Sequence, residues 1–469
     1  MKKFFLLAVL ILTVNSVNAQ WEPDVRLTND ADTSMTSMSR DKSIDAEGNF
    51  VHVVWYDTRD GNMEIYYKRS TDQGLTWGND IRLTNDTAQS KNPGIALSGN
   101  NLYLIFDDTR DSNREIYFKK STDYGNTWGE DVRLTFDTST SWAPSIEVNE
   151  SNIHVVWADK RGGAIGNIFY KKSSDGGVTW SDDKALTNDP ADSYNVSTSV
   201  FESNIYVVWN DTRSYSLGDI FYISSSDAGE SWTKEMNITA SFTTSWFPTI
   251  MSNGSDLYLI WSDSRAGGVE LYYMHSTDKG DSWEEEMRLT NANYYSQWAS
   301  LAVNCSNLYL VWQDSRSGNE EIYYKFSTDN GKTWSDDLLL SDNIATMSLR
   351  PNIVISDSII HVIWTDMRDN PNGEIYYKRN PTGNIVEVEE DFLPSRNFNI
   401  YPNPADDFIY LDSELKQLRK IQVFSVLGEK VLETELSNRI DVSMLPSGMY
   451  YFMITSGKYI ERKKFVIVR

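Results

Sequence analysis

Residues 55–59 read Trp-Tyr-Asp-Thr-Arg, and this Trp-x-Asp-x-Arg pattern determines how most of the chain is organised. The pattern recurs every 51 or 52 residues, starting at Trp55, Phe106, Trp157, Trp209, Trp261, Trp312 and Trp364. Only the second copy replaces the tryptophan, with Phe106. Seven copies at so constant a period indicate an array of similar structural units.

Each unit contains four short segments with the composition of β-strands. Examples are Pro144 to Val148, Asn152 to Trp157, Glu64 to Lys68 and Asp131 to Thr135. The second and third segments are almost continuously β-branched and aromatic, as expected when both faces of a sheet are covered. A four-stranded sheet repeated radially is a β-propeller, so we predict an all-β, seven-bladed propeller.

The ends of the array predict how the ring closes. The fourth-strand pattern first occurs at Arg26-Leu27-Thr28, before the first complete unit, and the last unit loses the pattern after Lys378. We therefore expect an N-terminal strand near Asp24 to Thr28 to complete the seventh blade. Such closure removes free sheet edges that would otherwise pair with other chains.

The turn between the third and fourth strands reads Ser-x-Asp-x-Gly-x-Thr/Ser-Trp, first at Ser70 to Trp77 and again from Ser121, Ser173, Ser225, Ser276 and Ser327. Aspartate accepts hydrogen bonds from its own turn, and glycine supplies a positive φ. The pattern resembles the Asp-box, or BNR, repeat of sialidases and related propellers, over roughly residues 20–385. That resemblance implies a structural role for the box aspartates Asp72, Asp123, Asp175, Asp227, Asp278 and Asp329.

Asp-x-Arg follows each second strand, and in the first, fifth and sixth units it extends to Asp-x-Arg-x-Gly-x-x-Glu, for example at Asp57, Arg59 and Glu64. A catalytic carboxylate pair is needed once, whereas this pattern recurs along the array. We therefore interpret these residues as ion pairs that brace the loops.

A functional site is expected where the blades differ, at the entrance of the first strand of each blade and the mouth of the central channel. Counting back from each Trp-x-Asp-x-Arg copy places unlike residues there. The candidate ligand-binding residues are Arg40, Asp41, Lys91, Trp142, Tyr194, Trp246, Trp298 and Arg350. Aromatic rings beside polar groups suit a sugar, and Arg40 and Arg350 could hold a carboxylate. Alternatively, the tryptophans plug the channel or cover blade ends.

Three functions are compatible with this pattern. The first is binding of glycans or glycoproteins at the channel mouth, and the second is an exo-acting, sialidase-like glycoside hydrolase. The third is a protein-interaction scaffold. The sialidase resemblance implies an arginine triad, a Tyr–Glu pair and an aspartate acid. Only Arg40 and Arg350 offer partial matches, so no catalytic residue is assigned.

No cofactor or metal ion is expected from the sequence. His52, His154 and His361 occupy one strand position that is tyrosine in other blades, which indicates core residues. The acidic loops Thr28 to Ser34 and Thr187 to Ser193 carry oxygen ligands that suit Ca²⁺, although solvated turns are the simpler interpretation.

The two ends of the chain carry targeting information. Residues 1–19 have two lysines, a short apolar run and a small residue before a cleavage point, as in a secretory signal peptide. Residues 386–395 form an acidic linker. Residues 396–469 predict a small β-sandwich that resembles the type A C-terminal sorting domain of type IX secretion, through Tyr401-Pro402-Asn403-Pro404 and a Leu-Pro-Ser-Gly segment. A carbohydrate-binding sandwich is the alternative.

These features predict a mature protein that is secreted or held at the outer-membrane cell surface. The type IX machinery is its expected partner, with no transmembrane segment, and we expect a monomer. The chain has 43 Lys+Arg against 67 Asp+Glu, a net charge of −24, which disfavours nucleic acid as a ligand. One cysteine, Cys305, cannot form an internal disulfide.

Overall fold

The computed structural model describes residues 21–39, 42–161, 166–213, 218–240, 243–292, 294–341, 345–383, 399–412, 420–425, 430–434, 439–456 and 459–469. The chain divides into two compact units, Met1–Asn384 and Ile385–Arg469. The described residues contain strands and no helix. The expected signal peptide, residues 1–19, and the expected acidic linker, residues 386–395, lie outside the described residues.

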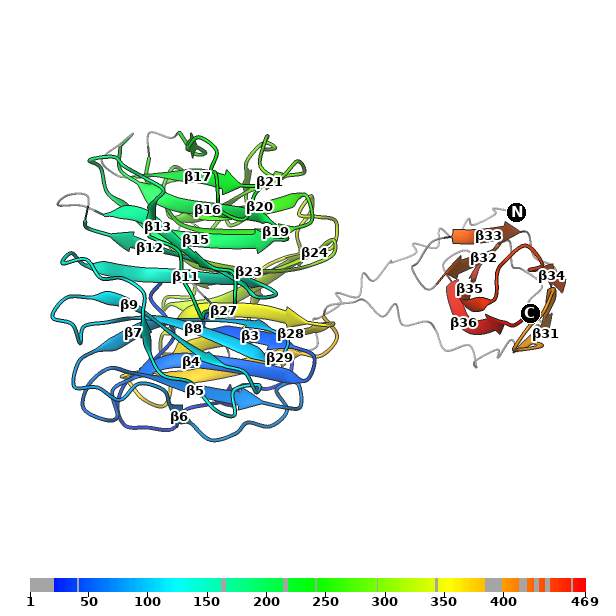
Figure 1. Cartoon of the computed structure of the whole chain (residues 1–469), viewed down its shortest axis with the longest axis horizontal. Coiled ribbons are helices and arrows are strands. Elements are labelled where there is room, and N and C mark those ends of the chain that lie inside the picture. The colour runs from blue at the N-terminus through cyan, green and yellow to red at the C-terminus, as the bar shows by residue number, and fades with distance from the viewer. Residues whose placement is uncertain are drawn as a thin grey trace, which may run out of the picture. The chain divides into compact units, whose positions relative to one another are not determined.

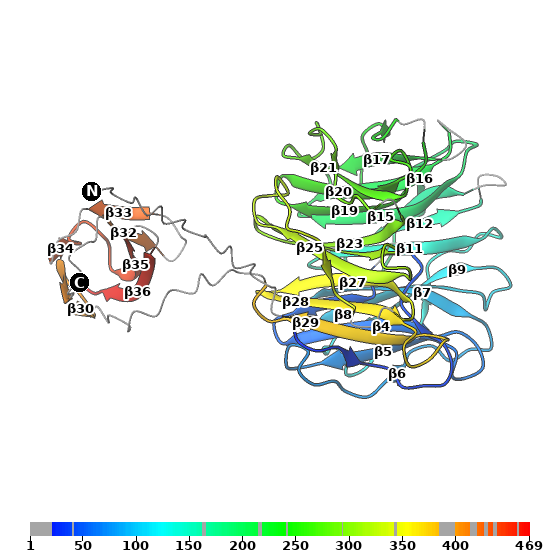
Figure 2. The same cartoon turned by 180° about the vertical axis from the view of Figure 1, so that it is seen from behind.

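The first unit is a propeller of seven antiparallel sheets (Figures 1 and 2). The innermost strands are β2 (Ser34–Met35) with β3 (Ile44–Glu47), β7 (Ser90–Ser98), β11 (Ser141–Asn149), β15 (Ser193–Phe201), β19 (Ser245–Asn253), β23 (Ser296–Asn304) and β27 (Ser348–Ser356). The second strands are β4 (Phe50–Asp57), β8 (Asn101–Asp108), β12 (Asn152–Asp159), β16 (Asn204–Asp211), β20 (Asp256–Asp263), β24 (Asn307–Asp314) and β28 (Ile359–Asp366).

The two outer positions of each sheet follow the same order. The third strands are β5 (Glu64–Ser70), β9 (Glu115–Ser121), β13 (Asn167–Ser173), β17 (Asp219–Ser225), β21 (Glu270–Ser276), β25 (Glu321–Ser327) and β29 (Glu374–Asn380). The two-residue outermost strands are β6 (Ile81–Arg82), β10 (Val132–Arg133), β14 (Lys184–Ala185), β18 (Met236–Asn237), β22 (Met287–Arg288), β26 (Leu338–Leu339) and β1 (Val25–Arg26). So short an outer strand offers little edge for pairing with another chain.

The ring closes through the N-terminal strand. β1 pairs antiparallel with β29, with Val25 opposite Tyr377 and Arg26 opposite Tyr376. The last blade, in yellow, lies beside the first, in blue, in both views (Figures 1 and 2). The predictions of seven four-stranded blades and of closure by the segment before the first unit are therefore confirmed.

The core lies between blades rather than within them. The repeated tryptophans Trp55, Trp157, Trp209, Trp261, Trp312 and Trp364 are fully buried. One apolar cluster, for example, joins Ile105 of the second blade to Val155 and Trp157 of the third. Since a sheet covered on both faces needs apolar residues on both, this packing explains the nearly continuous apolar second strands.

The Asp boxes close the turns between third and outermost strands. Asp72 accepts hydrogen bonds from Ser70 Oγ (2.7 Å), Thr76 N–H (2.8 Å) and Thr76 Oγ1 (2.6 Å). The box glycine also receives a tyrosine of the preceding blade. A Cβ on Gly125, whose φ is 75°, would lie 2.0 Å from Tyr67 Oη. The box therefore locks both its own turn and the neighbouring blade.

The second unit contains two small sheets with one shared core. Its first sheet joins β30 (Asn399–Tyr401), β31 (Phe408–Asp412) and β34 (Arg439–Asp441). Its second joins β33 (Lys430–Thr434), β32 (Lys420–Ser425), β35 (Gly448–Ser456) and β36 (Tyr459–Ile467). Ile409, Ile440, Val423 and Phe465, from both sheets, are buried together, as expected for a small sandwich. In the part of the chain that the structure describes, no helix has the length and hydropathy to cross a membrane.

Candidate functional site at the channel mouth

The residue pairing between neighbouring strands shows on which of the two faces of the propeller each loop lies. In the third blade, Ser141 pairs with Asp159 at one end of the inner hairpin, and Asn149 pairs with Asn152 at its turn. We call the end with Ser141 the upper face; it carries the inner-strand entrances and the loops between second and third strands. The Asp boxes, between the third and outermost strands, lie at the opposite, lower face.

The repeated Asp-x-Arg residues form a buried network at the upper face. Asp57 accepts hydrogen bonds from Ser34 Oγ (2.7 Å), Trp55 Nε1 (2.9 Å) and Arg59 Nη2 (2.6 Å). Burial alone would raise the pKa of Asp57, but the hydrogen bonds from Arg59 hold it below its usual value. The same aspartate–arginine pair, at 2.6–2.8 Å, occurs in all seven blades. These residues brace the loops, and none is left to act on a ligand.

Just inside the upper face, six inner strands are interrupted by a β-bulge. The residue at each bulge has a positive φ without being glycine: Asn92 (52°), Ala143 (49°), Asn195 (53°), Phe247 (54°), Trp298 (55°) and Arg350 (52°). This conformation is rare for residues with a side chain. Bulges commonly redirect side chains near functional sites, and here they present the non-repeated residues to the mouth.

Three of the six strained bulges are held by a side-chain acceptor of the preceding blade. Asn210 Oδ1 accepts the N–H of Phe247 (3.1 Å), and Gln313 Oε1 accepts the N–H of Arg350 (3.1 Å). Asp107 Oδ2 accepts the N–H of Ala143 (3.2 Å). These acceptors occupy the position between Trp and Asp in Trp-x-Asp-x-Arg, which sequence reasoning passed over although it differs in every blade: Tyr56, Asp107, Ala158, Asn210, Ser262, Gln313 and Thr365.

Three candidates, Trp246, Trp298 and Arg350, are brought together with Phe247 in what we call the aromatic cluster. Phe247 stacks on Trp298 with ring centroids 4.5 Å apart and 28° between the planes. Trp246 meets Phe247 edge-on at 6.4 Å. The Arg350 guanidinium lies 5.8 Å from the Trp298 ring centroid. All four side chains are half-buried, so each keeps an accessible surface at the mouth.

The other described candidates lie further round the same ring. Lys91 and Trp142 stand at neighbouring blades, and Lys160 Nζ lies 5.7 Å from the Trp142 ring centroid. Gly166 makes room for Trp142, because a Cβ there would lie 2.8 Å from the indole. Tyr194 is half-buried at the equivalent place in β15. Arg40 and Asp41 lie outside the described residues.

The inner strand of the first blade contains a longer interruption than those of the other blades, although the spacing of the Trp-x-Asp-x-Arg copies is unchanged. Eight residues separate the paired residues Met35 and Ile44, whereas two separate Trp142 and Ser145 in the third blade. Met35, opposite Tyr56, therefore occupies the place to which counting back assigned Arg40. The extra segment begins with Thr36, which bonds across to Thr365 and Arg350 of the last blade.

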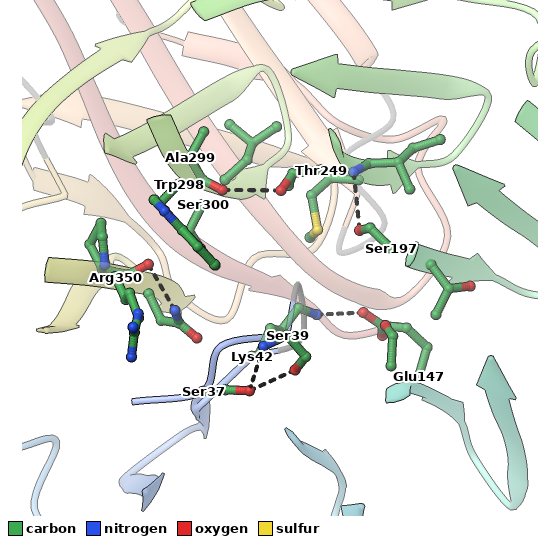
Figure 3. Close-up of a pocket in the computed structure, with 17 residues that line it drawn as sticks. Ser37, Ser39, Lys42, Glu147, Ser197, Thr249, Trp298, Ala299, Ser300 and Arg350 are labelled. Carbon is green, nitrogen blue, oxygen red and sulfur yellow. Dashed lines mark hydrogen bonds and ion pairs between the residues drawn. The ribbon is translucent and has the colours of Figure 1, made fainter. Parts of the chain in front are cut away.

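This segment also narrows the channel below the mouth. Ser37, Ser39 and Lys42 line a cavity of about 30 Å³, and Lys42 Nζ pairs with Glu147 at 2.7 Å (Figure 3). Burial raises the pKa of the adjacent Asp45 to about 6. A cavity of this size holds about one water molecule. Trp298 and Arg350 also line this cavity, which is too small to enclose a sugar, so a glycan beside them would lie on the open surface of the mouth.

The histidines and acidic loops have local partners. His52, His154 and His361 each bond through Nδ1 to a tyrosine hydroxyl, at 2.7, 2.8 and 2.7 Å. Burial lowers the pKa of His52 to about 3 and that of His154 to about 4, so both are neutral. In the loop Thr28 to Ser34, Asp30 Oδ1 accepts the N–H of Asp32 at 2.9 Å. Within the described residues no group of three or more His, Cys, Asp or Glu side chains is placed to hold a metal ion.

Comparisons with known families identify the two parts of the chain. Residues 399–468 match the secretion system C-terminal sorting domain, and residues 325–336 match the BNR/Asp-box repeat. The chain is thus an Asp-box propeller joined to a type IX sorting domain. The sorting domain indicates a protein that is secreted or at the outer-membrane cell surface, and implies contact with the secretion machinery.

Solved structures share the propeller fold. A PL25 ulvan lyase, described as bound to -[GlcA(1-4)Rha3S]-, matches with a TM-score of 0.57 at 11% identity, covering 74% of this chain and 94% of that one. The polysaccharide lyase Uly1 matches with a TM-score of 0.51 at 11% identity, covering 76% of this chain and 98% of that one. No curated protein sequence matches the chain.

Proposed function

We propose that the propeller binds glycans at the mouth of its channel on the upper face. The observation that carries the proposal is the aromatic cluster, in which Phe247 and Trp298 stack beside Arg350 on bulges that differ between blades. Aromatic faces pack against the C–H faces of sugars, while charged and polar groups select their substituents.

The bulges add a reason for affinity. Asn210 and Gln313 accept the backbone N–H groups of Phe247 and Arg350. The Phe247 ring and the Arg350 guanidinium are therefore oriented before a ligand arrives. Less side-chain freedom is then lost on binding. Two polysaccharide lyases share this fold, and one of them is described as bound to -[GlcA(1-4)Rha3S]-, which supports the proposal.

The test is a glycan array combined with affinity measurements on the best ligands. Trp298→Ala is expected to weaken binding about tenfold, because the variant loses both the buried apolar area of the indole and an aromatic contact worth about 0.5–1.5 kcal/mol beyond that area. Phe136→Ala is the matched control, since Phe136 is 70% exposed and lies at the outer edge of a blade. Equal affinities for wild type and Trp298→Ala would contradict the proposal, and a protein that binds no glycan would favour the scaffold hypothesis.

One observation favours a second candidate, cleavage of the bound glycan. Burial raises the pKa of Glu320, which shares Gln313 with the backbone of Arg350. A carboxyl group whose pKa is raised by burial beside a candidate sugar site suits a general acid. The check is release of reducing ends or of unsaturated products from the array's best ligands. Turnover that Glu320→Gln abolishes, with binding retained, supports cleavage; binding without turnover leaves a lectin-like propeller.

A further inference from the structure

Arginines in this propeller divide into two classes. Those of the Trp-x-Asp-x-Arg pattern all lie within 2.6–2.8 Å of a carboxylate, and most outer-strand arginines pair with a buried glutamate, as Arg82 does with Glu64 (2.9 Å). Arg114 and Arg350 at the mouth do not follow this rule. Among the described residues, Arg114 has one carboxylate contact, to Asp107 Oδ2 at 3.9 Å, and Arg350 has none within 4 Å.

Arg114 belongs to a set of residues that we call the cationic cluster: Lys91, Asp107, Arg114, Trp142 and Lys160. Lys91 of β7 lies opposite Asp107 of β8 in the sheet of the second blade. Arg114 comes just before β9, the third strand of that blade. The backbone carbonyl of Arg114 accepts the N–H of Ser141, next to Trp142, at 2.8 Å. Neither Lys91 nor Lys160 has a carboxylate within 4 Å in the described part of the chain.

The buried carboxylate of Asp107 fixes this arrangement without neutralising it. Its Oδ2 accepts from Asn92 Nδ2 (2.9 Å) and from the Ala143 N–H (3.2 Å). Its Oδ1 has no hydrogen-bond partner among the described residues, although Asp107 is fully buried. Desolvation, together with the charge of Arg114, lowers the pKa of Lys91. Lys91 and Arg114 thus flank one buried carboxylate, and Lys160 lies beside the indole of Trp142 in the next blade.

A cluster of this sign is unexpected on a chain with a net charge of −24. A protein so acidic repels polyanions in general, so an anion that binds must be held by specific groups. Arginine and lysine without carboxylate partners supply such groups, because their N–H donors remain free for a carboxylate or sulfate. Trp142 adds a ring face for the sugar itself.

Resting on the proposed function, we infer that the glycan bound at the mouth is acidic, with its carboxylate or sulfate held by Lys91 and Arg114 beside Trp142. Asp107 is a positioning residue here, since it holds the bulge at Ala143 and the cations around it. Arg350, in the aromatic cluster, offers a further contact for an anionic group on another sugar of the same glycan.

The experiment uses the whole chain and two matched pairs of polymers: polygalacturonate with its methyl ester, and dextran sulfate with dextran. Each pair keeps the backbone and removes the charge. Wild type is expected to bind at least one charged polymer at least tenfold more tightly than its neutral counterpart, with affinity that falls as salt is added. Tighter binding of polygalacturonate than of its methyl ester shows that the site recognises a carboxylate. Tighter binding of dextran sulfate than of dextran shows that it recognises a sulfate. If both charged polymers are preferred, the site accepts either anionic group.

The variants assign that preference to residues. Lys91→Met with Arg114→Met keeps the long apolar stems, and is expected to weaken binding of the charged polymer at least tenfold. Lys234→Met, on the exposed outer edge of the fourth blade, is the control and should bind as wild type does. Circular dichroism and the thermal midpoint confirm that each variant is folded. A destabilised double variant is replaced by the single substitution Lys91→Met, with a smaller expected loss of the same sign.

Two results separate failure of this inference from failure of the proposed function. Equal binding of charged and neutral polymers, with loss in Trp298→Ala, overturns the acidic ligand and leaves glycan binding intact. Binding of the charged polymer that is unchanged in the double variant also overturns the inference. No binding to any polymer or to the glycan array overturns both.

Discussion

Asp107 and Asp108 are consecutive residues of β8, both fully buried, yet their surroundings differ completely. Asp108 accepts from Ser90 Oγ (2.6 Å) and from Arg110 Nη2 (2.8 Å), as its counterparts do in every blade. Asp107 occupies the position that changes from blade to blade; one of its oxygens has no hydrogen-bond partner in the described residues, and burial raises its pKa. The repeated carboxylate maintains the ring, whereas its neighbour shapes the mouth.

Substitution of the two aspartates should separate these roles most strongly. Asp108→Ala removes the buried carboxylate of the pair and leaves Arg110 with Asp131 as its remaining carboxylate partner, and is expected to lower the free energy of unfolding of the propeller by about 3–5 kcal/mol. Asp107→Asn keeps the shape and removes a desolvated charge, so its effect should stay within about 1 kcal/mol. Urea titration followed by circular dichroism measures both. Similar losses in the two variants would mean that the neighbouring carboxylates share one role.

The lower face provides a second contrast, between an Asp-box glycine and a glycine of an open turn. Gly125→Ala would place a methyl group against the Tyr67 ring at a φ of 75°, and should cost about 2–4 kcal/mol. Gly99→Ala is its control: φ is 58° there, but nothing lies within 4 Å of the added carbon, so about 1 kcal/mol is expected. Thermal unfolding compares the two. Equal costs would show that the box glycine serves backbone conformation alone.

The smallest effect concerns a blade that lacks one element of the repeated network. Leu339 stands where four of the other outer strands carry arginine, and burial raises the pKa of Glu321, the carboxyl group that would pair with such an arginine, to about 7. Because this pKa exceeds the unfolded value of 4.5, ionisation of Glu321 costs stability as pH rises from about 4.5 to about 7.

Leu339→Arg should restore the pair seen between Glu270 and Arg288 (2.8 Å) and stabilise the propeller by about 1–2 kcal/mol at pH 8. The loss of stability between pH 4.5 and 7 should shrink in the variant. Ser341, Ser348, Asp366 and Arg368 also face this carboxyl group and are unchanged. Thermal midpoints across that pH range provide the measurement. A midpoint that falls equally in both proteins would assign the pH dependence to another group.

The sequence was sufficient for the parts of the fold that repeat. The spacing from Trp55 to Trp364 predicted seven blades, and the strand before the first unit predicted the closure on β29. The segment between Met35 and Ile44 was not predictable, because counting by a fixed period assumes that every inner strand has one length.

The details of the mouth depend on contacts between blades. Asp107 looked like one more variable residue, since its partners Ala143 and Arg114 come from another blade and another loop. Trp298 and Arg350 were proposed from their position alone, but the hydrogen bonds that hold Phe247 and Arg350 come from the preceding blade. The sequence therefore predicts a candidate region, and the geometry of its described residues comes from the structure.

Oxidative footprinting of the tryptophans tests most directly the claim that ligands bind where the blades differ. The whole chain is labelled by hydroxyl radicals with and without its tightest-binding glycan, and each tryptophan is followed by mass spectrometry. Trp142, Trp246 and Trp298 at the mouth and Trp77, Trp128 and Trp180 in the Asp boxes are all half-buried, so they form matched sets. The account predicts protection of the mouth set only; protection of the Asp-box set with an unprotected mouth would contradict it.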